Sequence, residues 1–108
     1  MNKTTANRKR KKFAHRLYLR PYKGAEKSGV IAYEIGNDFI ILKFKERSKD
    51  GKQIYLYNYA KPGGEHVEAM KKKAVKGKGL SAYRNQHVPK EEYAAYWDES
   101  LNRFIINS

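Results

Sequence analysis

The sequence predicts an α+β fold in a single compact domain, with an antiparallel meander of three or four strands followed by two or three short helices. Three observations support this class. Tyrosines alternate with other residues from Gln53 to Tyr59, and alternation with a period of two is typical of a strand. Gly36–Asp38 and Asp50–Gly51 are turn sequences between such segments. Glu65–Lys76 repeats apolar residues at the spacing of one helix face.

Length and composition limit the chain to one domain. Its 108 residues include 40% hydrophobic and 13% aromatic residues, more than a disordered chain carries. There is no cysteine, so neither a disulfide framework nor a cysteine-ligated zinc site is expected. The N-terminus lacks an apolar signal region, and no apolar run approaches the ~20 residues of a membrane span. We therefore expect a cytoplasmic protein without a membrane partner.

The first part of the chain is predicted to be an arm and an extended segment. Met1–Lys12 is basic and almost free of apolar residues, so we expect a mobile arm, with the folded domain spanning residues 13–108. Phe13–Tyr22 has apolar residues in both registers, which predicts a short strand or an irregular segment ending near Pro21.

The predicted meander has three strands. Gly29–Ile35 and Phe39–Glu46 form a hairpin, and Gln53–Tyr59 pairs beside it. Side chains alternate sides along a strand, so the third strand has three tyrosines on one face and two aliphatic residues on the other. These residues are Tyr55, Tyr57 and Tyr59 against Ile54 and Leu56. Apolar surface on both faces indicates a strand inside a sheet.

Helices are predicted to follow the sheet. Glu65–Lys76 places three residues on one face: Val67, Met70 and Ala74. The Gly77–Gly79 stretch ends this helix, and Ser81 is expected to cap a second short helix that runs through Val88. Pro89 fits the first turn of a third helix, Lys90–Asp98. Phe104–Ile106 is expected to dock as an edge strand. The residues expected in the core are Leu42, Phe44, Leu56 and Met70.

Residues 28–88 follow the pattern of a known family. The matching stretches are Gly29-Val-Ile-Ala-Tyr33, Phe39–Phe44, Gly51–Tyr57, Val67 and Met70, Ala74-Val-Lys-Gly77-Lys-Gly-Leu80 and Asn85. This pattern resembles the KTSC domain, a small family named after the C-terminal domain of some lysyl-tRNA synthetases, and short stand-alone proteins of bacteria and their phages. The arm, Tyr59 and Tyr93–Ile106 lie outside it. The resemblance implies a compact α+β module with a nucleic-acid connection and carries no catalytic residues.

Positive charge is the strongest indication of function. The net charge is +13, and residues 1–23 contain nine basic and no acidic residues, while residues 61–88 contain seven and two. Such fields attract polyanions, so nucleic acid is the favoured partner ahead of anionic membranes and acidic proteins. We expect contacts with RNA or DNA phosphates through the arm and the lysine-rich helix. The residues expected to make them are Lys9, Arg10, Lys11, Lys12, Arg16, Arg20, Lys72, Lys73, Lys76, Lys78 and Arg84.

The tyrosines of the third strand allow two interpretations. If exposed, Tyr55, Tyr57 and Tyr59 would form a platform on which unpaired bases stack. If the helices pack on that face, the same side chains belong to the core.

Two other functions stay open. Abundant tyrosine is typical of interface centres and supports a small phage- or mobile-element-type protein that docks on and modulates another protein. A metal-independent ribonuclease could use Tyr83, Arg84 and His87. No nucleophile motif, phosphate loop or dinucleotide fingerprint supports an enzyme. Because His15, His66 and His87 lack metal-ligand spacing, we expect no metal, cofactor or catalytic residue.

Overall fold

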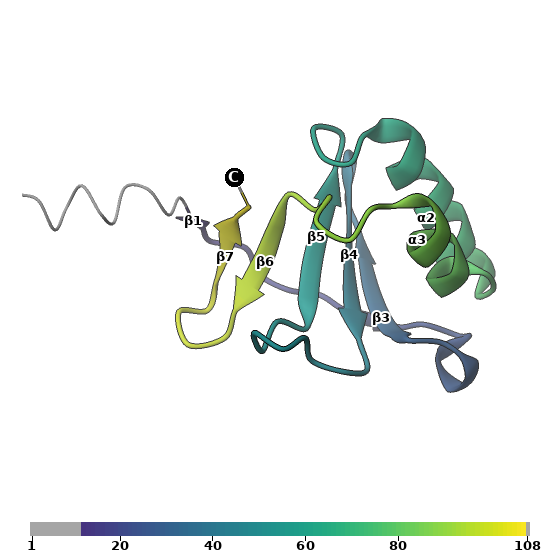
Figure 1. Ribbon diagram of the computed structural model, residues 1–108, viewed down its shortest axis with the longest axis horizontal. Coiled ribbons are helices and arrows are strands. Elements are labelled where there is room, and N and C mark those ends of the chain that lie inside the picture. The colour runs from purple at the N-terminus through teal and green to yellow at the C-terminus, as the bar shows by residue number, and fades with distance from the viewer. Residues whose placement is uncertain (1–11, 108) are drawn as a thin grey trace, which may run out of the picture.

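Seven strands and two α-helices make up residues 12–107, the part of the chain that this computed structural model describes (Figure 1). The strands form one antiparallel sheet in the order β1-β7-β6-β5-β4-β3-β2. They are β1 (Lys12–Phe13), β2 (Arg20–Pro21), β3 (Val30–Ile35), β4 (Phe39–Phe44), β5 (Ile54–Asn58), β6 (Ala95–Asp98) and β7 (Arg103–Ile106). The helices are α2 (Gly64–Lys76) and α3 (Leu80–His87), preceded by the 3-10 helix η1 (Ala25–Lys27). The α+β class is as predicted, but the predicted sheet of three or four strands is wrong.

The predicted meander forms the centre of this larger sheet. Leu42 of β4 lies opposite Tyr33 of β3 on one side and Tyr55 of β5 on the other. Strands β6 and β7 continue the sheet beyond β5, and the two-residue strands β1 and β2 lie at its two edges. The sheet is therefore extended on both sides by strands too short to give a periodic sequence pattern.

The predicted third helix, Lys90–Asp98, is wrong because this segment contains strand β6. Tyr96 pairs with Tyr55 of β5, and the opposite edge of β6 pairs with β7. Aromatic side chains fit a pleated, half-buried surface. Of the two partners of β6, β5 is distant in sequence and β7 follows after a short hairpin turn. Phe104–Ile106 does form a strand as part of β7, although it lies between β1 and β6 instead of at an edge.

Helices α2 and α3 cover one face of the sheet (Figure 1). The side chains buried between the two layers include Ile40, Leu42 and Tyr57 from the sheet and Val67, Met70 and Leu80 from the helices. Leu42 and Met70 are fully buried, and Phe44 packs against this cluster at its margin. The face of α2 predicted from helical spacing is therefore the face that enters the core.

Two glycines with left-handed backbone separate α2 from α3. Gly77 has a φ of 80°, and its N–H donates to carbonyls in the last turn of α2, which closes that helix. Gly79 has a φ of 81° and caps α3, which begins at Leu80. Ser81, the predicted cap, therefore lies inside the helix.

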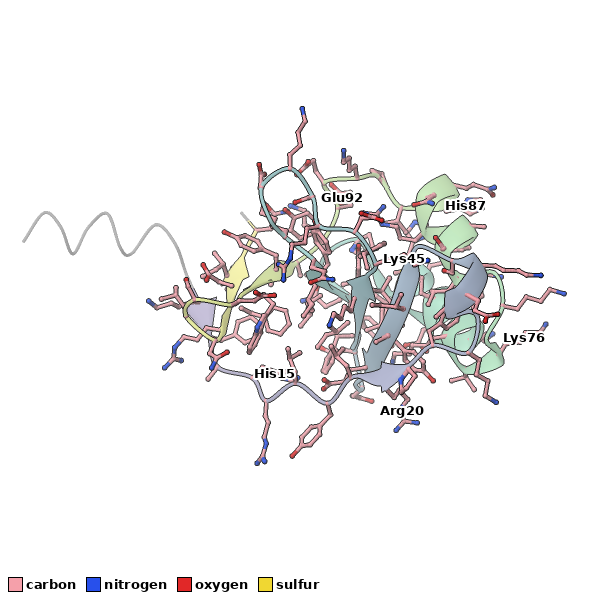
Figure 2. The ribbon with its side chains drawn as sticks, turned by 90° about the horizontal axis from the view of Figure 1, so that it is seen from below. His15, Arg20, Lys45, Lys76, His87 and Glu92 are labelled. Carbon is pink, nitrogen blue, oxygen red and sulfur yellow. The ribbon has the colours of Figure 1, made fainter. Side chains whose placement is uncertain are left out.

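Residues 14–19, here called the crossing segment, cover the other face of the sheet. The segment runs from β1 at one edge to β2 at the opposite edge, and Figure 2 shows it passing His15 and reaching Arg20. Leu17 and Leu19 pack on a second core. The buried members of that core are Ile41, Ile54, Leu56, Ala95 and Phe104. Of the two structures predicted for Phe13–Tyr22, a strand forms only at the two ends, and the residues between them form the irregular segment.

Glu34 of β3 holds the crossing segment on the sheet. His15 Nε2 lies 2.9 Å from one carboxylate oxygen, and the backbone N–H of Tyr18 donates to the other at 2.6 Å. The sheet thus has a core on each face. Leu42 and Leu56, predicted as members of one core, are buried on opposite faces.

Neither helix in the described residues combines the length and apolar composition needed to cross a membrane.

Candidate nucleic-acid interface

The first predicted contact region comprises Lys9–Lys12, Arg16 and Arg20. Lys9, Arg10 and Lys11, half of it, lie outside the described residues. Lys12 is exposed in β1, at the sheet edge where the chain enters the folded domain. Arg16 is exposed on the crossing segment, with its guanidinium carbon 5.4 Å from the centre of the Tyr18 ring. Arg20 is exposed in β2 at the opposite sheet edge. The basic residues of this first region are therefore spread over different parts of the molecule.

The second predicted region is a group of lysines at the C-terminal end of α2. Lys72, Lys76 and Lys78 are exposed, and Lys73 is half-buried with its Nζ 5.6 Å from the centre of the Tyr83 ring. Figure 2 shows Lys76 at this end of the molecule. Lysines near a helix C-terminus also have favourable electrostatics with the helix dipole, so their presence alone does not identify a ligand.

Two lysines that sequence reasoning missed join this group from the β2–β3 connection. Lys23 and Lys27 line a hollow of about 490 Å³ together with Lys78. We define the lysine end as the six residues Lys23, Lys27, Lys72, Lys73, Lys76 and Lys78. Among the residues that line the hollow, Glu26 is the acidic one.

Close backbone packing brings these distant lysines together. A Cβ atom at Gly24 would come within 2.7 Å of the Gly77 carbonyl oxygen, and one at Gly77 within 2.8 Å of Lys23 Cβ. Glycine permits this approach and also the positive φ of Gly77. Within residues 12–107, no ion pair involves any lysine of the lysine end. Their charges are therefore available to an external anion.

The structure does not bring the two predicted regions together. The crossing segment with Arg16 lies on the sheet face opposite α2, and Lys12 lies at the sheet edge opposite η1. Arg20 is the member of the first region that shares an edge with the β2–β3 connection. A ligand on the lysine end consequently meets a different surface from one that contacts Lys12 and Arg16.

Tyr55 and Tyr57 of β5 and Tyr59, which follows β5, do not form one exposed platform. Tyr57 is 1% exposed beneath the helices, Tyr55 is half-buried, and Tyr59 is 49% exposed. Tyr59 Oη donates to Glu68 Oε2 at 2.5 Å, which ties its side chain to α2. Of the three, Tyr55 lines a cavity.

That cavity, here called the aromatic cleft, has a volume of about 460 Å³ and lies where α3, the β4–β5 turn and the segment before β6 meet. Its apolar lining consists of three rings in edge-to-face contact. Phe44 and Tyr55 have centroids 5.6 Å apart, and Tyr55 and Tyr93 have centroids 4.9 Å apart. Five basic and three acidic residues also line it: Arg47, Lys49, Lys52, Arg84 and Lys90, with Glu46, Asp50 and Glu91.

Arg84 lies in this cleft instead of joining the lysine end. Its guanidinium carbon is 4.8 Å from the centre of the Phe44 ring, its Nε donates to Tyr57 Oη at 3.3 Å, and its Nη1 donates to Asn85 Oδ1 at 3.1 Å. Burial raises the pKa of Tyr57 to about 12, and the charge and hydrogen bond of Arg84 oppose that effect without cancelling it. Tyr57 is therefore a neutral acceptor that holds Arg84 in place.

Lys52 is the second fixed cation of the cleft. Its Nζ donates to Tyr93 Oη at 3.1 Å and lies 4.2 Å from the centre of the Tyr96 ring. Partial burial lowers the pKa of Lys52, but the hydrogen bond to Tyr93 and the charges of Tyr93, Tyr96 and Asp50 outweigh it, so the pKa lies above its usual range. The cleft therefore holds two permanent cations beside an aromatic lining.

The histidines form no site with Arg84. His66 Nδ1 lies 2.8 Å from Tyr83 Oη, and the ring centroids of Tyr83 and His87 are 4.7 Å apart, whereas Arg84 contacts Tyr57 and Phe44. The three residues considered for a ribonuclease are thus divided between two environments. In the described part of the chain, no group of three His, Cys, Asp or Glu side chains is placed to hold a metal ion.

Comparison with protein-family models, curated proteins and solved structures finds no match to this chain. The resemblance to the KTSC domain therefore stays a prediction, and function must be argued from the geometry of the lysine end and the aromatic cleft.

Proposed function

We propose that this protein binds nucleic acid, with the lysine end contacting backbone phosphates. The observation that carries the proposal is that Lys23, Lys27 and Lys78 line one hollow at the end of α2, and that this end of the helix also holds Lys72, Lys73 and Lys76. None of these six lysines has an ion-pair partner within residues 12–107. Bringing like charges together destabilises the free protein, and a polyanion reduces that repulsion. Phosphate contacts of this kind supply affinity without reading sequence.

Salt dependence is the measurable signature of such binding. Each neutralised phosphate of a duplex releases counterions, so log affinity falls against log salt with a slope of about −0.9 per contact. Full engagement of the lysine end would give a slope of about −5, and non-specific affinity at physiological salt would be about 10⁻⁴–10⁻⁶ M.

The experiment is a salt titration of fluorescently labelled RNA and DNA duplexes with three proteins. The test protein carries Lys73→Gln, Lys76→Gln and Lys78→Gln. Its matched control carries Lys43→Gln, Lys61→Gln and Arg103→Gln, which remove the same charge from positions outside both predicted contact regions. Parallel arms with RNA and DNA determine which backbone is preferred.

The proposal requires the slope to become less negative by about 3 in the test protein and to change much less in the control. Equal changes in the two variants would show that net charge alone determines binding and would contradict a lysine-end site. Absence of binding by the parent protein at low salt would remove the nucleic-acid function and favour docking on another protein.

A further inference from the structure

We infer that the aromatic cleft takes one unpaired nucleotide of a single-stranded nucleic acid whose neighbouring phosphates lie on the lysine end. This inference rests on the proposed function and specifies its ligand as a single strand instead of a duplex. Four features of the cleft support it: its size, its ring lining, its two fixed cations and its position beside the hollow lined by Lys23, Lys27 and Lys78, here called the lysine hollow.

The size and lining of the cleft suit a planar aromatic ligand. About 460 Å³ falls within the range of small-molecule sites, which is about 300–1,000 Å³. Phe44 and Tyr55 are half-buried, so they line the cleft without filling it. Aromatic rings and guanidinium planes are the groups on which proteins stack unpaired bases. The guanidinium carbon of Arg84 already lies 4.8 Å from the centre of the Phe44 ring.

The two cations retain hydrogen-bond donors for an anion. A guanidinium has five N–H donors, and Arg84 uses two of them, toward Tyr57 and Asn85. An ammonium has three, and Lys52 uses one toward Tyr93, with Asp50 Oδ2 at 3.9 Å from its Nζ as an ion-pair partner. Because the contacts with Tyr57 and Tyr93 fix both groups, little side-chain freedom remains to be lost when a phosphate binds.

The aromatic cleft lies next to the proposed site for nucleic-acid phosphates. Gly29 lines the aromatic cleft and Ser81 lines the lysine hollow. These two residues are in near contact, because a Cβ atom at Gly29 would lie 3.4 Å from Ser81 Oγ. A single nucleic-acid strand can therefore pass from the lysine hollow to the aromatic cleft. Its phosphates would contact Lys23, Lys27 and Lys78, and one base would enter the cleft.

The shared chemistry of the ligand is a base joined to a phosphate, which a strand and a free mononucleotide both offer. A base held in a duplex cannot enter the cleft without unpairing, so the geometry favours single strands over duplexes. The lysine hollow extends the site beyond one nucleotide, which favours a strand over a mononucleotide.

The test compares binding of a single strand of about 10 nucleotides, a duplex and a mononucleotide at one fixed salt concentration. The cleft variants are Tyr55→Leu, which removes a ring, and Arg84→Met and Lys52→Met, which remove the fixed cations while keeping an aliphatic stem. Lys45→Met and Arg103→Met are charge-matched controls outside the cleft. A 2-aminopurine base in the strand reports stacking by its change in fluorescence.

The inference requires the parent protein to prefer the strand over both other ligands. Tyr55→Leu and Arg84→Met should each reduce single-strand affinity by about fivefold or more, which corresponds to the loss of one stacked base, and should leave duplex affinity within about twofold. Lys52→Met should reduce single-strand affinity in the same direction, and the controls should retain it. The fluorescence change should disappear with Tyr55→Leu.

Three results would overturn the inference. One is equal affinity for the mononucleotide and the strand. The second is equal loss in the cleft variants and the controls. The third is unchanged single-strand affinity in folded Lys52→Met and Tyr55→Leu proteins. These two variants also test the inference if Arg84→Met fails to fold. Duplex binding with the expected salt slope would persist in these cases, whereas failure of the proposed function would abolish binding of strand and duplex alike.

Discussion

Phe104→Ala tests whether the sheet has a core on its second face. Phe104 is fully buried, and its ring centroid lies 5.4 Å from that of Phe13, 5.0 Å from that of Trp97 and 5.8 Å from that of His15. Truncation removes these contacts and leaves a cavity, which for a buried phenylalanine costs about 3–5 kcal/mol. Total stability of a small domain is about 5–15 kcal/mol, so this loss is a large fraction of it.

The assay is urea unfolding followed by the fluorescence of Trp97, with Leu101→Ala as the control. Leu101 is 46% exposed, and its truncation should change the free energy of unfolding by no more than about 0.5 kcal/mol. The midpoint for Phe104→Ala should fall without a change in the slope of the transition. A loss below about 1 kcal/mol would refute the burial of this face.

A double-mutant cycle shows whether the crossing segment is what covers that face. Leu17 packs against the cluster that contains Phe104, so the two truncations should be non-additive by about 0.5–3 kcal/mol. Strict additivity would mean that Leu17 does not share this core in solution.

Four further outcomes are expected. Leu42→Ala should lower the free energy of unfolding by about 2–5 kcal/mol in denaturant melts, because Leu42 is fully buried under the helices, and a loss under about 0.5 kcal/mol would contradict its placement. Gly77→Ala should cost about 1–3 kcal/mol by thermal melting, since φ is 80° and its Cβ would meet the β2–β3 connection; an unchanged melting temperature would exclude this packing. Tyr57 has a pKa of about 12 in the folded protein and about 10 in the unfolded chain, so the unfolded chain loses this proton first as pH rises. The free energy of unfolding should therefore fall by about 2–3 kcal/mol between about pH 10 and pH 12. Tyr57→Phe should lack this contribution in melts across that range. Deletion of residues 1–11 removes five basic side chains but spares β1, so it should weaken nucleic-acid binding with an unchanged melting temperature; full affinity after deletion would show that the predicted arm does not contribute.

The predictable parts of this fold are those whose burial is visible in local periodicity. Strand β5 alternates tyrosines with aliphatic residues because both of its faces are covered, and α2 repeats apolar residues because one of its faces is buried. Strands β1 and β2 have two residues each, and β6 has four. The partner of β1 and one of the two partners of β6 are distant in sequence, and strands of two residues are too short to show a period. Local periodicity therefore could not reveal these strands.

The crossing segment shows a second limit of sequence reasoning. Leu17 and Leu19 alternate with exposed Arg16, Tyr18 and Arg20, which looks like a strand, yet residues 14–19 have no ladder of backbone hydrogen bonds. Tertiary packing on the second core and the two bonds to Glu34 hold the segment extended instead. Apolar residues in both registers of Phe13–Tyr22 therefore predicted a strand or an irregular segment without deciding between them.

Charge density identified four of the six lysines of the lysine end, because they are close together in the sequence. Lys27 was missed because it follows Glu26, and Lys23 was missed because it stands apart from the lysines of residues 71–78 in the sequence. The contact of Gly24 with Gly77 brings both to the end of α2. The aromatic cleft was not predictable as a unit, because Phe44, Lys52, Arg84 and Tyr93 come from different segments. The sequence did point to two of its residues, Arg84 as a phosphate contact and Tyr55 as a stacking residue. Both line the same cavity.

The most direct test of the account is a titration of ¹⁵N-labelled protein with a single-stranded oligonucleotide, followed by amide chemical shifts. Binding as proposed should perturb three segments together: Lys23–Gly29, Lys76–Arg84 and Lys52–Tyr55. The crossing segment, residues 14–19, should remain unperturbed because it lies on the opposite face of the sheet. Shifts concentrated on the crossing segment, or no shifts at low salt, would contradict the assignment of the lysine end and the aromatic cleft as the nucleic-acid interface.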